Sequence, residues 1–335
     1  MAVDIPFGLV ARGPSGPAPA RRTGSVRRTS TIDMRWPEGP GTQLRLTGRS
    51  RDLLTPDDGE LVVLAEDAMS VGVNSLTRTI EDIATDPPRP AVTGMIGARG
   101  GGSSRKVLAE VLPDEAAAGT PLYLMLDDIA GASLVAGFAY SRWMPREQLL
   151  VAMANGPRRS MEGICTGFQP GSEALMPDGS SRWNHQVHTV GPLPREDDPI
   201  GWHELSEITE ISMRRARRID VTMGDVIEID SMFQDSSTVP EGGRVAVHEY
   251  LVKATADRVT GEILSMSADP RVLPYDECPL ASLSVDRIVG TPLRDLRAAV
   301  LEIFPGTAGC THLNDAMRAM AEVPVLVDAL RSADR

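Results

Sequence analysis

Arg214-Arg-Ala-Arg-Arg-Ile-Asp220 aligns without a gap with Arg27-Arg-Thr-Ser-Thr-Ile-Asp33, and the two runs are 187 positions apart (220 − 33). Three further landmarks recur in the same order at nearly the same separation. They are Pro56-Asp-Asp-Gly59 with Pro240-Glu-Gly-Gly243 (240 − 56 = 184), Asp86-Pro87 with Asp269-Pro270 (270 − 87 = 183), and Gly119 with Gly309 (309 − 119 = 190). Four landmarks in one order predict an internal duplication. The alternative is convergence, because few residue types suit turns.

Each repeat is predicted to consist of strands followed by helices. Alternating apolar residues between turn residues predict strands, and apolar residues at helical spacing predict helices. The predicted strands are 30–36, 43–48, 61–73 and 75–83 in the first repeat, and 213–221, 226–233, 244–254 and 261–267 in the second. The predicted helices are 104–111, 122–140, 292–303 and 311–330, the last with a kink at Pro324. We therefore predict an α+β fold: two related units of antiparallel strands followed by helices, joined by a long irregular connection.

Four segments are predicted along the chain: a flexible arm over 1–26, a first α+β unit over 27–145, a connection or cover over 146–212, and a second α+β unit over 213–335. The arm is rich in Pro, Gly, Ala and Arg, a composition typical of flexible termini. As a basic clamp on a neighbouring subunit it would instead make a homo-oligomer. The connection holds three of the five histidines, which favours a functional cover over disorder.

The composition is typical of a soluble globular protein. Of 335 residues, 41 % are hydrophobic, and the formal net charge is −12. Such an acidic chain lacks the basic face that nucleic-acid phosphates require. Three cysteines do not make a disulfide framework, and the chain shows neither a secretory signal pattern nor an apolar run of about 18 residues. We therefore expect a cytoplasmic protein without nucleic-acid or membrane partners.

Nucleotide-binding motifs are also missing from the sequence. The Gly-rich run 97–104 lacks the Gly-Lys-Ser/Thr ending of a P-loop and does not form a dinucleotide fingerprint between a strand and a helix. Chemistry that needs no organic cofactor is therefore expected.

Reactive side chains gather in the second repeat. Cys310 follows a Gly-rich turn and begins a predicted helix, where unpaired N–H groups and the helix dipole tend to lower a thiol pKa. His312 lies two positions later and does not face Cys310 on a helix, so His248 is the better partner for the thiol. The alternative is that Cys310 is a small buried residue. In the first repeat, the positions of Cys310, His312 and His248 hold Thr120, Leu122 and Leu64.

The connection and the basic run supply further candidates. His185 and His188 are three positions apart, a spacing that suits an acid–base pair or a metal, although two surface histidines are the simpler alternative. Cys278, with Cys310, His312 and His248, offers four possible ligands for zinc, but without the usual finger spacing. Arg215 and Arg217 are expected to hold an anionic substrate group, or else to pair with acidic residues of the protein.

Four short runs resemble one known family. They are Arg217-Arg-Ile-Asp220, Val247-His-Glu-Tyr250, Tyr275-Asp-Glu-Cys-Pro279 and Gly309-Cys-Thr-His-Leu313. Together they resemble the bacterial family called domain of unknown function 2889, over roughly residues 213–331. The family label carries no activity, so the resemblance implies a group without a mechanism.

The sequence is thus interpreted as a cofactor-independent acid–base enzyme of lyase, isomerase or hydrolase type, acting on a small organic and anionic substrate. Proton transfer and catalysis are expected from His185, His188, His248, Cys310 and His312, with the connection folded over the second unit so that His185 or His188 lies near His312. A metal-dependent enzyme with Cys and His ligands is one alternative. A non-catalytic ligand-binding or assembly protein is the other.

Overall fold

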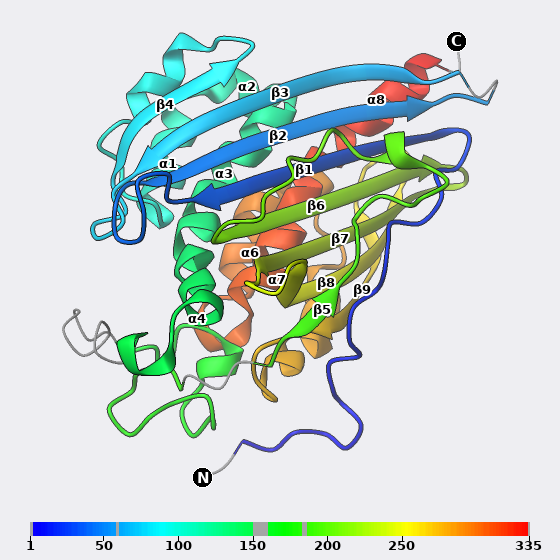
Figure 1. Ribbon diagram of the computed structural model, residues 1–335. Coiled ribbons are helices and arrows are strands. Elements are labelled where there is room, and N and C mark those ends of the chain that lie inside the picture. The colour runs from blue at the N-terminus through cyan, green and yellow to red at the C-terminus, as the bar shows by residue number, and fades with distance from the viewer. Residues whose placement is uncertain (1–2, 58–59, 150–159, 183–185, 334–335) are drawn as a thin grey trace.

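The strands of the protein form one antiparallel sheet in the computed structural model, which describes residues 3–57, 60–149, 160–182 and 186–333. The strand order is β4-β3-β2-β1-β6-β7-β8-β5, and β9 also pairs with β8 (Figure 1). The first four strands are β1 (Ser25–Arg35), β2 (Leu44–Thr55), β3 (Val62–Val73) and β4 (Ile80–Asp86). The others are β5 (His188–Val190), β6 (Ser212–Met223), β7 (Val226–Thr238), β8 (Arg244–Asp257) and β9 (Ile263–Val272). The predicted α+β class is confirmed, and both groups of strands belong to one continuous sheet.

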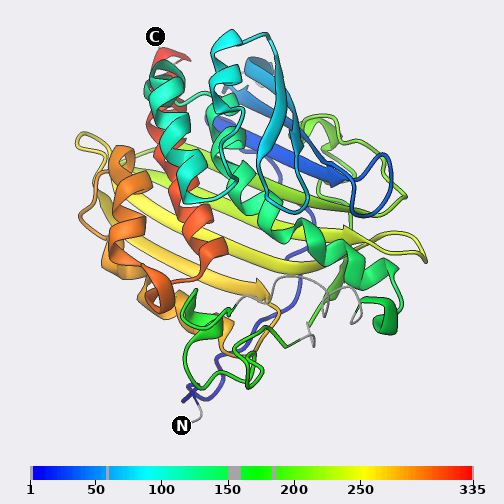
Figure 2. The same ribbon diagram turned by 90° about the vertical axis from the view of Figure 1, so that its left-hand side faces the viewer.

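Helices follow each group of four strands and cover one face of the sheet (Figure 2). After β4 come α1 (Gly102–Val111), α2 (Pro113–Ala118), α3 (Pro121–Val135) and α4 (Tyr140–Trp143). After β9 come α6 (Leu296–Ile303), α7 (Thr311–Arg318) and α8 (Val323–Ala333). Short 3₁₀ turns lie at Pro90–Met95, Ala136–Ala139, Thr166–Phe168, Pro199–Gly201, Cys278–Ile288, Leu293–Asp295, Gly306–Ala308 and Ala319–Glu322. The last of these turns divides the predicted helix 311–330, and Pro324 falls in the first turn of α8, where proline is tolerated.

The helix α3 is the central helix of the first half. The helical run Pro121–Trp143 is long and apolar enough to cross a membrane by length and composition alone, and 78 % of its most apolar window is buried inside the protein. It packs against β1, β2 and β3, and it carries two acidic residues, Asp127 and Asp128, that pair with arginines of the second half. This burial is typical of a core helix.

Several strands are longer than predicted, because they include charged residues that the prediction placed outside the strands. β1 begins at Ser25 and includes Arg27 and Arg28, which are 2 % and 1 % exposed. Because these charges are paired inside the protein, they do not end the strand. β4, in contrast, begins at Ile80 and not at position 75, because the Asn74 side chain accepts the N–H groups of the next residues and makes a turn.

Two reciprocal ion pairs join the halves of the sheet at β1 and β6. Arg27 donates from Nε and Nη2 to Asp220 at 2.5 and 2.8 Å, and Arg214 donates from the same two nitrogens to Asp33 at 2.6 and 2.9 Å. The two strands pair along their length, with Ser30 opposite Arg217 at the centre. The runs 27–33 and 214–220 therefore form the contact between the halves, because the first arginine of each run binds the final aspartate of the other.

A second layer of ion pairs lies between the sheet and the helices. Asp128 of α3 accepts two hydrogen bonds from Arg217 of β6, both at 2.6 Å. Asp127 of α3 accepts two from Arg318 of α7, at 2.8 and 2.9 Å. Burial alone would raise the pKa of Asp127, but Arg297, Arg318 and Arg105 lower it to about 2. These pairs tie the central helix of the first half to the strands and helices of the second.

The opposite face of the sheet is crossed by the N-terminal arm and by the end of the connection (Figure 1). A small apolar cluster covers it there, formed by Ala18, Leu193, Trp202, Ala216 and Met232. The arm packs against β9 of the same chain, where the N–H of Arg12 donates to the carbonyl of Pro270 at 3.0 Å. The arm predicted as flexible thus has specific contacts here, and β1 begins inside its predicted range.

The substitution Asp128→Asn tests the ion pairs between α3 and β6. It should lower the free energy of unfolding by about 3–5 kcal/mol, because it leaves the buried Arg217 without a full counter-charge. Asp197→Asn is the matched control: its pair with Arg195 is exposed, so its removal should leave the free energy of unfolding nearly unchanged. Urea unfolding followed by circular dichroism measures both, and equal effects would contradict this account of the junction.

Candidate active site

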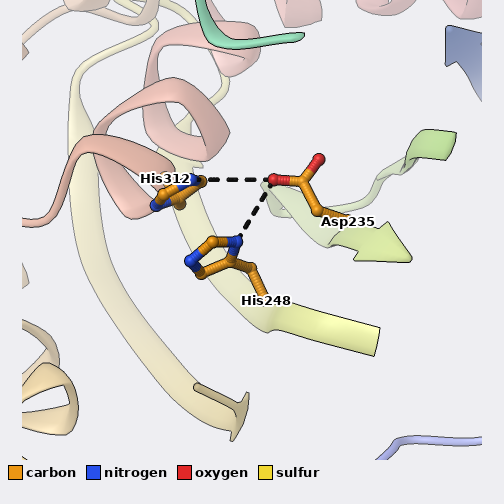
Figure 3. A group of neighbouring side chains, drawn as sticks. All are labelled: Asp235, His248 and His312. Carbon is orange, nitrogen blue, oxygen red and sulfur yellow. Dashed lines mark ion pairs between the residues drawn. The ribbon is translucent and has the colours of Figure 1, made fainter. Parts of the chain in front are cut away.

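Three polar side chains, two buried and one partly buried, meet where α7 begins over the sheet. Asp235 comes from β7, His248 from β8 and His312 from the first turn of α7. β7 and β8 are paired so that Asp235 lies directly opposite His248, next to a β-bulge that adds one residue to β8. Figure 3 shows both imidazoles lying beside the Asp235 carboxylate.

The two imidazoles contact the same carboxylate oxygen. His248 Nδ1 lies 3.4 Å from Asp235 Oδ2, and His312 Nε2 lies 3.7 Å from that oxygen (Figure 3). The rings are stacked on each other, with centroids 3.5 Å apart and planes inclined by 18°. Asp235 is fully buried, whereas the histidine side chains are 11 % and 16 % exposed.

Arg215 holds the Asp235 carboxylate in place. Its Nε and Nη2 donate to the two oxygens at 2.9 and 3.0 Å, and its Nη1 donates to Asp315 of α7 at 3.2 Å. Burial opposes the Asp235 charge, but the guanidinium and the neighbouring histidines together lower the Asp235 pKa. The carboxylate is therefore an anion at neutral pH, rigidly oriented by a bidentate pair.

The His312 ring is neutral at neutral pH. Burial lowers its pKa well below the usual value, and the neighbouring charges of His248 and Arg215 lower it further, against the opposing effect of Asp235. A neutral imidazole can accept a proton, and an adjacent carboxylate stabilises the imidazolium that results. This arrangement is suited to moving protons.

Cys310 caps the N-terminus of α7 but does not gain thiolate character there. Burial raises the pKa of its thiol, and this effect exceeds the lowering by the N–H groups of Leu313 and His312. Tyr250 and Cys278 lie beside it, and burial likewise raises the Cys278 pKa. The expectation of a lowered Cys310 pKa is thus corrected. The N–H groups at the helix start do lower the pKa, as predicted, but burial of the thiol away from water raises it by more.

Arg215 and Arg217 face the protein interior. They are 1 % and 3 % exposed, and Arg217 gives its donors to Asp128 and to the backbone carbonyl of Asp315. Of the two interpretations that the sequence allowed, the structure favours internal pairing over a substrate clamp. Arg215 contributes to the site indirectly, by orienting Asp235.

The predicted connection reaches the start of α7 at Thr166. The N–H of Thr166 donates to the carbonyl of Gly309 at 2.8 Å, which brings Cys165 close to Cys310. His188 is exposed in β5, where it pairs with Ala246 two residues before His248, and His185 lies outside the described residues. His203 lies on the opposite face, with its two ring nitrogens 2.9 and 2.8 Å from the hydroxyls of Thr29 and Thr31.

Asp235 was missed by the sequence analysis. It follows the predicted strand 226–233 in a polar run, where an aspartate is usually exposed. A usable signal was present in the predicted repeat: Arg28 and Asp52 of the first half form a bidentate pair at 2.6 Å, and in the predicted alignment Arg215 and Asp235 are their counterparts. The offsets, 215 − 28 = 187 and 235 − 52 = 183, match those of the other landmarks.

One comparison with known proteins identifies part of the chain. Residues 213–326 match the family DUF2889, described as a protein of unknown function. The resemblance drawn from the short motifs is therefore confirmed over this range, which includes all three residues of the site. No curated protein and no solved structure matches the chain.

The three cysteines should be unreactive in the folded protein. Burial raises the pKa of the Cys165 thiol to about 12 and raises those of Cys278 and Cys310 as well, so the thiolate that alkylating reagents attack is scarce at neutral pH. Iodoacetamide followed by mass spectrometry should label them slowly until urea unfolds the chain. Fast labelling of Cys310 under native conditions would contradict the assigned thiol state.

Proposed function

We propose that the DUF2889 domain of this chain, residues 213–326, carries an acid–base catalytic site built on His248 and His312. The observation that supports it best is the pair of stacked, partly exposed imidazoles on one buried carboxylate, Asp235. The reaction class is that of a lyase, isomerase or hydrolase that uses no organic cofactor. The substrate is a small organic molecule that is anionic or becomes so during the reaction.

In this proposal His248 is the proton acceptor. Its Nδ1 faces Asp235, and the pair is 3.4 Å apart, a length that shortens readily when substrate binds. The Nδ1–H tautomer leaves Nε2 as the basic nitrogen, by the same logic that orients histidine in a catalytic triad. His312 stacks on this ring and serves as the second proton carrier, since a proton on one ring disfavours a proton on the other.

The substrate charge follows from the position of α7. Its first turn carries the partial positive charge of a helix N-terminus and lies beside both imidazoles. Proton abstraction would add an imidazolium at the same place. Both features stabilise a developing negative charge on the substrate, such as an enolate or a tetrahedral oxyanion.

The proposal can be tested without knowing the substrate. Pools of small carboxylic acids, hydroxy acids and esters are incubated with the protein in D₂O and followed by proton NMR. Abstraction of a carbon-bound proton exchanges it for deuterium, while elimination, isomerisation and hydrolysis each change the spectrum. Conversion by the wild type that is lost in His248→Gln would support the site, and conversion that His248→Gln and His312→Gln leave intact would refute it.

With an active substrate in hand, His248→Gln and His312→Gln should each lower kcat by about 10²-fold or more. His203→Gln is the matched control, because that histidine is also buried but binds Thr29 and Thr31 on the far face of the sheet. It should lower the melting temperature and leave kcat nearly unchanged. His188→Gln should change neither, whereas a large loss of kcat there would bring β5 into the site, as the sequence suggested.

A metal centre is the second candidate, because Asp235, His248 and His312 present ligand atoms that all lie within 4.8 Å of one another. Two features make it the weaker one. The stacked rings are nearly parallel, so their in-plane lone pairs do not converge on one point, and the Asp235 carboxylate already binds Arg215 through both oxygens. Elemental analysis of the purified protein decides: one bound transition metal per chain that is lost in Asp235→Asn would favour the metal site.

We also propose that the two halves arose by duplication. The reciprocal pairs Arg27–Asp220 and Arg214–Asp33 use the same atoms, as expected when two copies of one unit meet across a two-fold axis. The helix caps agree: Thr120 caps α3 and Cys310 caps α7, 190 positions apart (310 − 120). An experimental structure in which Arg27 and Arg214 made unlike contacts would count against a duplication.

The duplication would explain why only one half carries a site. Leu64 and Leu122 of the first half stand at the positions of His248 and His312, while the pair Arg28–Asp52 stands where Arg215–Asp235 stands. The first half would then retain only the structural ion pair Arg28–Asp52. In the second half, two histidines would have been added beside the corresponding pair Arg215–Asp235.

A further inference from the structure

We propose that residues 62–67 of β3 form a dimerisation edge, to which a second copy of this chain adds its own β3 in antiparallel orientation. This inference is independent of the catalytic proposal. It concerns the outer side of the first half of the sheet, far along the strand order from the site on β7 and β8.

The edge exists because β4 is shorter than β3. β4 pairs with residues 68–73 of β3, and β2 covers the other side of β3 along nearly its whole length. In Figure 1, β3 continues well beyond the end of β4. No described strand pairs with the outer side of residues 62–67, so their outward N–H and C=O groups are available to another strand.

Four of the six side chains of this edge, at positions 62–65, are apolar, and three of these four are exposed. Val62, Val63 and Leu64 are 42 %, 52 % and 39 % exposed, although successive residues of a strand point to opposite faces. Natural edge strands are usually protected by charged residues, proline or a β-bulge. In the run Leu61-Val-Val-Leu-Ala-Glu-Asp67 the first five residues hold neither charge nor proline, Glu66 and Asp67 end the apolar stretch, and Leu64 is the extra residue of a bulge in the pairing with β2. An open edge with a run of five uncharged residues favours strand addition.

The other side of the sheet shows how such an edge is covered. Residues 244–246 of β8 pair with β5, which the connection supplies, and the arm donates N–H groups to the end of β9. At the offset of 184 that relates the turns before β3 and β8, residues 60–62 correspond to 244–246. The first half has no described counterpart of β5 there.

A second copy of the chain can pair with this edge without bringing its carboxylates, Glu66 and Asp67, opposite those of the first copy. Pairing about the middle of the edge, between Leu64 and Ala65, sets Val62 opposite Asp67, Val63 opposite Glu66 and Leu64 opposite Ala65. No two carboxylates then face each other, which avoids a repulsion that destabilises cross-strand pairs. The junction of β1 with β6 already shows two four-strand groups of this chain joined edge to edge by antiparallel strands.

Sedimentation velocity over a concentration series tests the proposal with the full chain. The wild type should sediment as a dimer that dissociates on dilution, and Val63→Lys should shift it to monomer, because an edge lysine blocks strand addition. Leu264→Lys is the matched control, an exposed apolar residue of β9 at the opposite side, and it should leave the dimer intact. Circular dichroism checks that both variants are folded.

Two results would overturn the proposal. One is a wild type that stays monomeric at the highest concentration reached. The other is a dimer that survives Val63→Lys, or that dissociates only in Leu264→Lys. Hydrogen exchange gives an independent reading, since amides of residues 62–67 should become protected as the concentration rises. Unchanged exchange there in a proven dimer would place its interface elsewhere.

Discussion

The pairing of buried arginines with carboxylates is the constraint on which this structure depends. A charge taken out of water costs several kcal/mol unless a partner with good geometry meets it. Here β1 and β6 place Arg27, Arg28, Arg214, Arg215 and Arg217 in the interior, so aspartates must arrive from the facing strands and helices. The fold is specified by these requirements: Asp220 and Asp33 fix the register of the two halves, and Asp128 fixes the position of α3.

The candidate site is an extension of the same network. Arg215 binds Asp235 on one side and Asp315 of α7 on the other, so the guanidinium that joins sheet to helix also sets the position of α7 over β8. His312 is carried by that helix and His248 by that strand. The geometry of the two imidazoles is therefore a consequence of how the charged core is packed. A carboxylate held by a bidentate arginine is also a rigid support for a proton-transferring pair, as catalytic geometry requires.

The sequence allowed the fold class, the approximate positions of most strands and the family to be predicted, because alternation, turn residues and the Gly-Cys-Thr-His-Leu run are local signals. It did not reveal that Arg215 and Arg217 are buried. Charged residues are usually exposed, and their burial is tolerated only when a partner of opposite charge offsets the loss of hydration. Asp235 was missed for the same reason. The Cys310 pKa was expected to fall because a helix start can be recognised in sequence, whereas desolvation by β8 and the connection arises only in the folded chain.

The central claim is that Arg215 and Asp235 hold the two stacked imidazoles in place with the His312 ring neutral. NMR titration of the protein labelled with ¹⁵N-histidine tests it most directly, with His312→Gln identifying the resonance. The account predicts that the His312 ring stays neutral through the pH at which a free histidine is half protonated, about 6.5, and that its nitrogen shifts respond to Asp235→Asn. A His312 resonance that titrated near that ordinary value, indifferent to the loss of the Asp235 charge, would contradict it.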